Sequence, residues 1–324
     1  PAPESFPLKT RIFLSLKNNP SIMKSLLFST LCCLLTGTYI SAQTNTHFTN
    51  PEIYSILKGN YDPTTYLPAF PIDDPYTISE DMLHRISPDS MKATLIALRP
   101  FHTRNTGSDT ISETTGIGAA RKWILNQFER NSIAQGGRLV TGYLKFDQDV
   151  CGMLSHKNVV AVLPGRDTTD PSCIIIEAHF DSRCAGLCDV DCLAEGMEDN
   201  GSGTALVVEL ARVMSEYYVF DHTIVFMTVT GEEQGLAGSY AFATYAVQEN
   251  IPIKVVLNND IVGGIICGET SSAPSCPALN HIDSTQVRLF SYGGFNSPHK
   301  ALSRFNKLEY NEMIKPISTV PMMV

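Results

Sequence analysis

Three predominantly apolar runs, at residues 174–178, 223–229 and 253–257, constrain the fold of this chain more than any other feature. Each has the length of a strand and lacks the alternation of a strand that faces solvent on one side, which is typical of strands buried on both faces. Helical patterns separate the runs, over residues 204–214 and 236–246. We therefore expect an α/β fold with a mixed, mostly parallel central sheet flanked by helices on both faces.

Further elements are expected upstream of these runs. Residues 139–146 and 158–163 have the composition of strands, and a helical pattern opens after Ser87. Residues 43–80 are rich in Pro, Thr and Tyr and are expected to wrap the surface.

The N-terminal segment has the composition of an export signal. Residues 23–42 begin at Met23 with a short positive start, continue through a short apolar core and end in a small residue, Ala42. The alternative, a membrane anchor, is disfavoured because the apolar run falls short of the ~20 residues that span a bilayer. Residues 1–22 are interpreted as upstream, non-native translation, which leaves residues 43–324 as the domain. The sequence thus predicts a secreted or periplasmic protein without stable membrane insertion.

The charge of the chain limits its partners. Its formal net charge is −9 at pH 7. An acidic chain is poorly suited to nucleic acid or to an anionic membrane surface, because both repel it. The sequence therefore predicts no nucleic-acid partner.

Seven cysteines follow residue 42, and disulfides are the expected state in an exported protein. Cys184, Cys188 and Cys192 are four residues apart, which is not the C-x-x-C spacing of a zinc knuckle. Cys267 and Cys276 bracket a Gly/Ser/Pro loop that they could close. The sequence alone does not determine the connectivity.

Polar motifs rich in carboxylates follow the apolar runs or open a helical pattern. They are A-H-F-D-S at 178–182, E-D-N-G-S-G at 198–203, T-G-E-E at 230–233 and N-N-D at 258–260. The candidate site residues in these motifs are His179, Asp181, Asp199, Glu232, Glu233 and Asp260. Each motif alone fits a turn, a helix cap or a solvated face. Together they point to one site, because ligands collect at the carboxyl ends of parallel strands.

Histidine with several carboxylates is a ligand set that suits zinc, and two zinc ions ~3.5–4 Å apart need a bridging carboxylate. Asp199 is the natural candidate for the bridge, since Gly201 and Gly203 allow close backbone approach around it. Adjacent glutamates point in different directions, so one can bind a metal while the other serves as the base. Asp181 is well placed to hold the nitrogen of His179 that faces away from the metal.

These motifs resemble the co-catalytic zinc peptidases of family M28, which include the bacterial leucyl aminopeptidases. The most specific element is G-E-E-x-G-L-x-G-S, here from residue 231. The resemblance implies a zinc exopeptidase fold with His179 and Asp260 on one zinc and Glu233 on the other. It further implies Asp199 as the bridge, Glu232 as the general base, Asp181 as the residue that orients His179, and a cis peptide after Asp199.

The C-terminal part departs from the family pattern, whose last ligand is a histidine near the end of the domain. Only His281 and His299 follow Asp260, and neither comes after an apolar run. We expect that ligand beyond Val324, so that a C-terminal part of the domain is missing and the chain as given is inactive through truncation. The apolar residues at 321–324 are expected to form a strand that enters the sheet.

Three functions remain compatible with the sequence. The first is a secreted zinc aminopeptidase that uses a metal-activated water on peptide substrates. The second is a glutaminyl-peptide cyclotransferase, which shares His-x-Asp and Glu-Glu but uses one zinc. The third is a non-catalytic, peptidase-like binding module. The G-L-A-G-S segment after Glu232 and Glu233 favours the peptidase.

Overall fold

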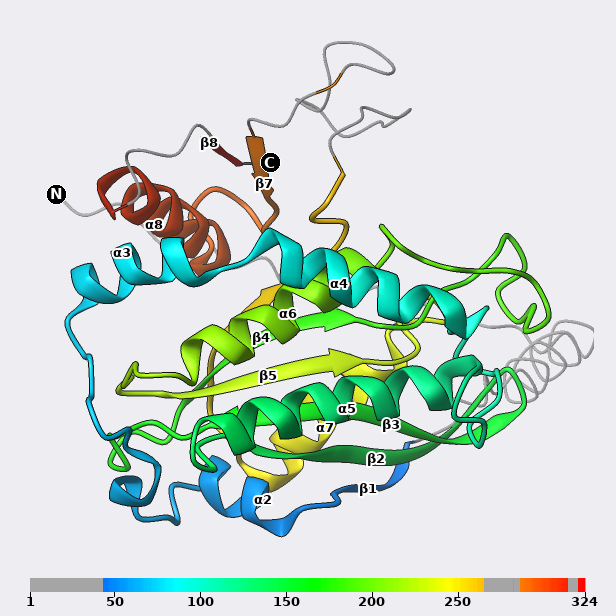
Figure 1. The fold of residues 1–324 in the computed structure, drawn as a ribbon, viewed down its shortest axis with the longest axis horizontal. Coiled ribbons are helices and arrows are strands. Elements are labelled where there is room, and N and C mark those ends of the chain that lie inside the picture. Colours follow the sequence, from blue (N-terminus) through cyan, green and yellow to red (C-terminus); the bar gives the residue numbers. More distant parts are fainter. Residues whose placement is uncertain (1–42, 265–281, 283–285, 314–319, 324) are drawn as a thin grey trace, which may run out of the picture. The chain divides into compact units, whose positions relative to one another are not determined.

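The computed structural model describes residues 43–264, 282, 286–313 and 320–323. Its central sheet has six strands in the order β1-β2-β3-β5-β4-β6 (Figure 1). In that order they are β1 Thr44–Phe48, β2 Val140–Val150, β3 Met153–Leu163, β5 Thr223–Val229, β4 Cys173–His179 and β6 Ile253–Asn258. The three apolar runs of the sequence are thus neighbours in one sheet.

The sheet is mixed, as expected, but its parallel part is smaller than expected. Parallel pairing joins β5, β4 and β6, whereas antiparallel pairing joins β1, β2, β3 and β5. The reason lies in the connection between β2 and β3, which consists of Cys151 and Gly152, both at positive φ. A two-residue turn of this kind permits only an antiparallel hairpin.

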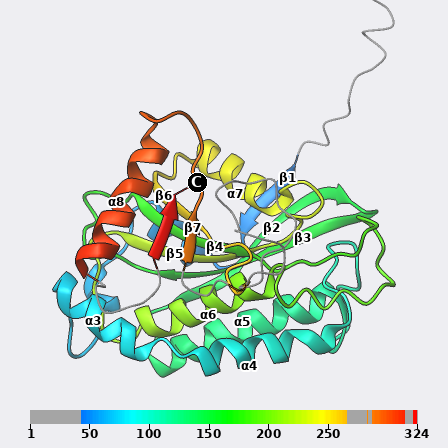
Figure 2. The same cartoon turned by 90° about the horizontal axis from the view of Figure 1, so that it is seen from above.

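Helices cover both faces of the sheet, which confirms that part of the expectation. Figure 2 shows α4, α5 and α6 on one face and α7 on the other. The covering helices are α2 Pro51–Leu57, α4 Pro88–Leu98, α5 Gly116–Ala134, α6 Gly201–Met214 and α7 Ala237–Glu249. Alternate residues of β4 enter opposite cores: Ile176 packs with the α5 and α6 side, and Ile175 with the α2 and α7 side. This alternation is that of a strand buried on both faces.

Residues 43–80 are more regular than expected. They form β1, which pairs with β2 at the edge of the sheet, and α2, followed by the 3₁₀ helix η1 (Pro63–Tyr66) and α3 (Pro75–Arg85). Side chains cap these helices: Asn50, Asp62 and Asp74 each accept a hydrogen bond from a backbone N–H of the first turn. Local capping therefore gives helices where the composition alone suggested irregular chain.

Strand β6 is exposed, contrary to the expectation of a buried strand. The side chains of Val256 and Leu257 are 46% and 36% exposed. Among the strands that the structure describes, β6 is last in the sheet order and pairs with β4 alone. An apolar run in an edge strand lacks the cover that a second neighbouring strand provides.

The C-terminal elements form a separate small sheet. Its strands are β7 Gln286–Leu289 and β8 Val320–Met323, and α8 Pro298–Met313 lies between them in the chain. Far upstream, the short 3₁₀ helix η2 (Arg99–Phe101) follows α4. The strand expected at the end of the chain is present as β8, but it pairs in parallel with β7 instead of entering the central sheet.

Some expectations concern residues that the structure does not describe. The interpretations of residues 1–22 and 23–42, the loop closed by Cys267 and Cys276, and His281 all lie outside the described residues. Among the described helices, none combines the length and apolar character that crossing a membrane requires.

Asn158 of β3 connects the sheet to the turn that follows β5. Its side chain is fully buried, donates a hydrogen bond to the Gly238 carbonyl oxygen (2.8 Å) and accepts one from the Thr230 backbone N–H (3.1 Å). Both ends of the 230–238 turn are therefore held by one amide side chain. A buried polar group that satisfies two backbone groups at once is costly to remove, because both lose their partner.

We expect Asn158→Ala to lower the free energy of unfolding by about 2–4 kcal/mol, since it leaves the Thr230 N–H and the Gly238 carbonyl unpaired in the interior. The matched control is Asn126→Ala on the exposed face of α5, where a change within about 0.5 kcal/mol is expected. Urea unfolding measures both. Equal losses in the two variants would contradict this role for Asn158.

Candidate metal centre

His179 is the last residue of β4, and its imidazole is buried. Parallel pairing sets it beside Val229, the last residue of β5, so the polar residues after both strands meet at one edge of the sheet. The Thr204 hydroxyl of α6 donates to the His179 carbonyl oxygen (2.9 Å) and fixes the end of the strand. The ring therefore occupies a rigid position.

The Nε2 atom of this ring has no hydrogen-bond partner although it is buried. Carboxylate oxygens nevertheless surround it: Asp199 Oδ1 lies at 3.1 Å, Asp260 Oδ1 at 3.4 Å and Glu232 Oε2 at 3.9 Å. Ligand atoms of a tetrahedral zinc ion, each about 2.0–2.2 Å from the metal, are about 3.3–3.6 Å apart. Of the residues that the structure describes, His179, Asp199 and Asp260 form a group whose ligand atoms all lie within 4.8 Å of one another. These residues fit a zinc ion.

The negative charges of the carboxylates around His179 also favour a bound cation. Burial lowers the pKa of the His179 imidazole, but the nearby carboxylates of Asp181, Asp199 and Asp260 outweigh it and raise that pKa to about 12. The surplus of negative charge thus holds a positive charge at this point, either a proton or a metal ion. Imidazole and carboxylate are together the donor set of zinc enzymes.

Asp181 lies behind the ring and has no exposed surface. Its Oδ1 is 3.5 Å from His179 Nδ1, and its backbone oxygen is 3.2 Å from the same nitrogen. The two carboxylate oxygens also accept the backbone N–H groups of Glu232 and Glu233, each at 3.2 Å. Asp181 is therefore placed to orient the imidazole, as expected, and it also fixes the Glu-Glu turn, which the sequence did not indicate.

The adjacent glutamates diverge. Glu232 turns its carboxylate toward His179, whereas the Glu233 carboxylate, 10% exposed, forms an ion pair with the Arg183 guanidinium. Burial is the main cause that raises the pKa of Glu232, and the charges of Asp181, Asp260 and Glu233 raise it further against the opposing effect of His179. A carboxylate with a raised pKa is suited to accept and release a proton. The roles of Glu232 as base and Glu233 as second ligand stay predictions.

Asn200 links the segments that carry two candidate carboxylate ligands, Asp199 and Asp260. The peptide between Asp199 and Asn200 is cis, and the Asn200 side chain caps α6 by accepting the Gly203 N–H at 2.8 Å. The same side chain donates to the Asn259 carbonyl oxygen at 2.9 Å and accepts the Ile261 N–H at 3.3 Å. Asp199 and Asp260 are therefore held side by side through their neighbours.

Two arginines contribute to the centre that the sequence analysis did not single out. The Arg104 side chain is buried and donates to the backbone oxygens of Phe180 and Gly196, at 2.7 and 2.8 Å. Burial lowers its pKa to about 10, while the charges of Asp181 and Asp199 oppose that effect. It therefore remains a fixed cation beneath the carboxylates. Nothing in the local sequence indicates this, because its partners are backbone oxygens from distant segments.

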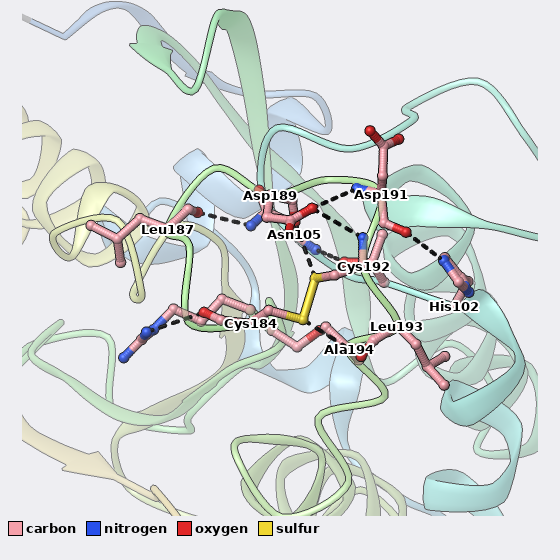
Figure 3. The surroundings of a disulfide bond; sticks show 12 residues. His102, Asn105, Cys184, Leu187, Asp189, Asp191, Cys192, Leu193 and Ala194 are labelled. Carbon is pink, nitrogen blue, oxygen red and sulfur yellow. Dashed lines mark hydrogen bonds between the residues drawn. A yellow bond between two sulfur atoms is a disulfide. The ribbon is translucent and has the colours of Figure 1, made fainter.

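Arg183, the second of these arginines, begins a loop that disulfides hold. The bonds are Cys184–Cys192 and Cys151–Cys188, while Cys173 is free and buried. Figure 3 shows the Cys184–Cys192 bond among the residues that anchor this loop. The Leu187 carbonyl oxygen accepts the side-chain amides of Asn105 and Gln234, each at 2.9 Å. Cys184, Cys188 and Cys192 thus form disulfides, as expected, and not a zinc knuckle. The hydrogen bond from Gln234 to Leu187 holds the loop against the Glu-Glu turn.

We expect Gly203→Ala to damage the centre, because a Cβ there would lie 2.1 Å from the Asn259 backbone oxygen. Relief requires α6 and the segment before Asp260 to separate, which we expect to cost at least about 3 kcal/mol of stability and to weaken zinc binding. The control is Gly294→Ala, where an added Cβ meets nothing within 4 Å. Thermal unfolding and zinc titration of both variants test this. A Gly203→Ala protein with unchanged zinc affinity would contradict the close packing.

Comparison with known proteins agrees with this geometry. The model of Peptidase family M28 matches residues 158–266, which include the six candidate site residues from His179 to Asp260. A probable zinc metalloprotease of Pyricularia oryzae is 33% identical over 236 residues, 69% of this chain and 47% of that protein. Leucine aminopeptidase 1 of Coccidioides posadasii is 29% identical over 187 residues, 56% of this chain and 45% of that protein. The chain thus spans about half the length of these curated relatives.

A solved structure shares the fold. The LapA aminopeptidase of Legionella pneumophila superposes with a TM-score of 0.58 at 21% identity, over 79% of this chain and 59% of that one. The sheet, the helices on both of its faces and the matched motifs agree with one another. The chain belongs to peptidase family M28.

Proposed function

We propose that this protein is a zinc-dependent exopeptidase of the aminopeptidase type, which hydrolyses N-terminal residues from peptides. The observation that carries the proposal is the unpartnered, buried Nε2 of His179 among carboxylate oxygens, with Glu232 beside them. The names of the relatives support a metallopeptidase and an aminopeptidase. Peptides are accordingly the proposed substrates.

His179, Asp199 and Asp260 would hold the zinc ion that the geometry fits best. Zinc bound there supplies Lewis-acid polarisation of the scissile carbonyl and lowers the pKa of water. Glu233 would serve a second ion, with Asp199 between the two positions, and this number of ions is part of the proposal.

The chain's own residues would then move the proton. The Glu232 carboxylate accepts a proton from the attacking water as the water oxygen bonds to the carbonyl carbon. When the carbon–nitrogen bond breaks, the same carboxyl group returns the proton to the leaving amine. Asp181 keeps the His179 ring and the Glu232 backbone in place during these steps.

Export is proposed on two grounds. The first is the composition of residues 23–42, and the second is the pair of disulfides, which persist in oxidising compartments. A secreted or periplasmic location after cleavage near Ala42 follows.

A peptide with N-terminal glutamine distinguishes hydrolysis from cyclisation, because the two reactions release different products from it. A peptide with N-terminal glutamine should yield free glutamine and the shortened peptide, detected by mass spectrometry. Release of ammonia with a pyroglutamyl peptide would instead assign a cyclotransferase. The same peptide with an acetylated N-terminus should resist, because an aminopeptidase needs a free amine, and its cleavage would overturn the exopeptidase assignment.

We expect Glu232→Gln to lower kcat/KM by about 10²–10⁴-fold, because an amide cannot accept the proton. Zinc content should stay that of the wild type, since Glu232 Oε2 is the most distant of the three oxygens around His179 Nε2, at 3.9 Å. Glu80→Gln, on an exposed position of α3, is the control and should keep wild-type rates. Activity assays with metal analysis decide, and loss of zinc in Glu232→Gln would show that Glu232 is a ligand instead.

A further inference from the structure

Arg183 is a cationic side chain beside the metal centre that has no part in the mechanism proposed above. Arg183 Nε donates to Glu233 Oε2, and Arg183 NH1 lies 3.3 Å from the Cys184 carbonyl oxygen. The side chain is 38% exposed, and its charge also acts on Asp199 and Glu232. Arg183 is therefore a positive charge at the side of the centre where Glu233 lies.

The two proposed metal positions differ in whether a cationic side chain already pairs with a candidate ligand. At the first, the buried Nε2 of His179 has no partner, and the oxygens of Asp199 and Asp260 stand at ligand spacing around it. At the second, the carboxylate of Glu233 already has a cationic partner. The first position therefore needs a cation, whereas the second has one in the form of the guanidinium.

The disulfide-held loop keeps Arg183 in this place. Its backbone lies between Ser182, whose hydroxyl donates to the Ala194 carbonyl oxygen (2.7 Å), and Cys184, which is bonded to Cys192. The loop is fastened to the Glu-Glu turn by the hydrogen bond from Gln234 to Leu187. Arg183 and Glu233 thus lie on two segments, the disulfide-held loop and the Glu-Glu turn, that a hydrogen bond joins.

We propose that Arg183 competes with the second metal ion for Glu233, so that the protein holds one zinc ion tightly and a second weakly and exchangeably. A divalent ion that binds Glu233 must displace the guanidinium or bind next to it, and like charges a few ångströms apart repel even in water. This inference rests on the proposed role of Glu233 as a ligand. It makes Arg183 a positioning residue that sets the occupancy of the centre.

The test compares zinc binding by the full chain and by Arg183→Gln, using equilibrium dialysis and calorimetry in chelator-buffered zinc. We expect Arg183→Gln to bind the second ion at least about tenfold more tightly, with a smaller change for the first. Arg183→Lys keeps the charge and should stay within about threefold of the wild type. Arg166→Gln is the control, since Arg166 pairs with Asp73 and Asp221, follows β3 and lies at the opposite end of the sheet.

The outcomes separate the possibilities. Second-ion affinity that is unchanged or lower in Arg183→Gln would overturn the inference and show that Arg183 supports Glu233 as a ligand. An Arg183→Lys protein that binds as tightly as Arg183→Gln, or an equal gain in Arg166→Gln, would overturn the local electrostatic origin. Absence of zinc at the first position in the wild type would instead overturn the proposed function.

Discussion

The buried carboxylate of Asp181 is the interaction on which the rest of the centre depends. It faces the imidazole of His179 at the end of β4 and accepts both backbone N–H groups of the Glu-Glu turn after β5. One side chain thus sets the ring orientation and the starting points of Glu232 and Glu233. A buried carboxylate is tolerated there because hydrogen-bond donors surround its oxygens and Arg104 supplies a nearby positive charge.

Asn200 positions the segments that carry Asp199 and Asp260, as Asp181 positions His179 and the Glu-Glu turn. It caps α6 directly after Asp199 and bonds to the backbone on both sides of Asp260. Candidate ligands from the end of β4, from just before α6 and from just after β6 therefore converge through two polar side chains. Converging elements of this kind are rigid, which is what a metal site requires.

The sequence was sufficient where the chemistry follows a strand. The sequence predicted that His179, Glu232 and Asp260 lie close together, because each follows an apolar run, and the sheet brings the ends of those runs together. It was not sufficient for Arg104 and Arg183, because the partners of both come from segments far away in the chain. The exposure of β6 and the antiparallel half of the sheet were missed for the same reason: neighbours in space decide them, and local periodicity does not report neighbours.

The two arginines differ in a way that would let the two proposed metal positions behave differently. The guanidinium of Arg104 is buried and donates to backbone oxygens, so its charge is fixed by the fold and no carboxylate has to release it. The guanidinium of Arg183 is partly exposed and bound to a carboxylate, so a stronger cation can replace it there. On the proposed assignment, a cation at His179 would follow from the fold itself, whereas a metal ion at Glu233 would compete with Arg183 and so depend on the concentration of metal around the protein.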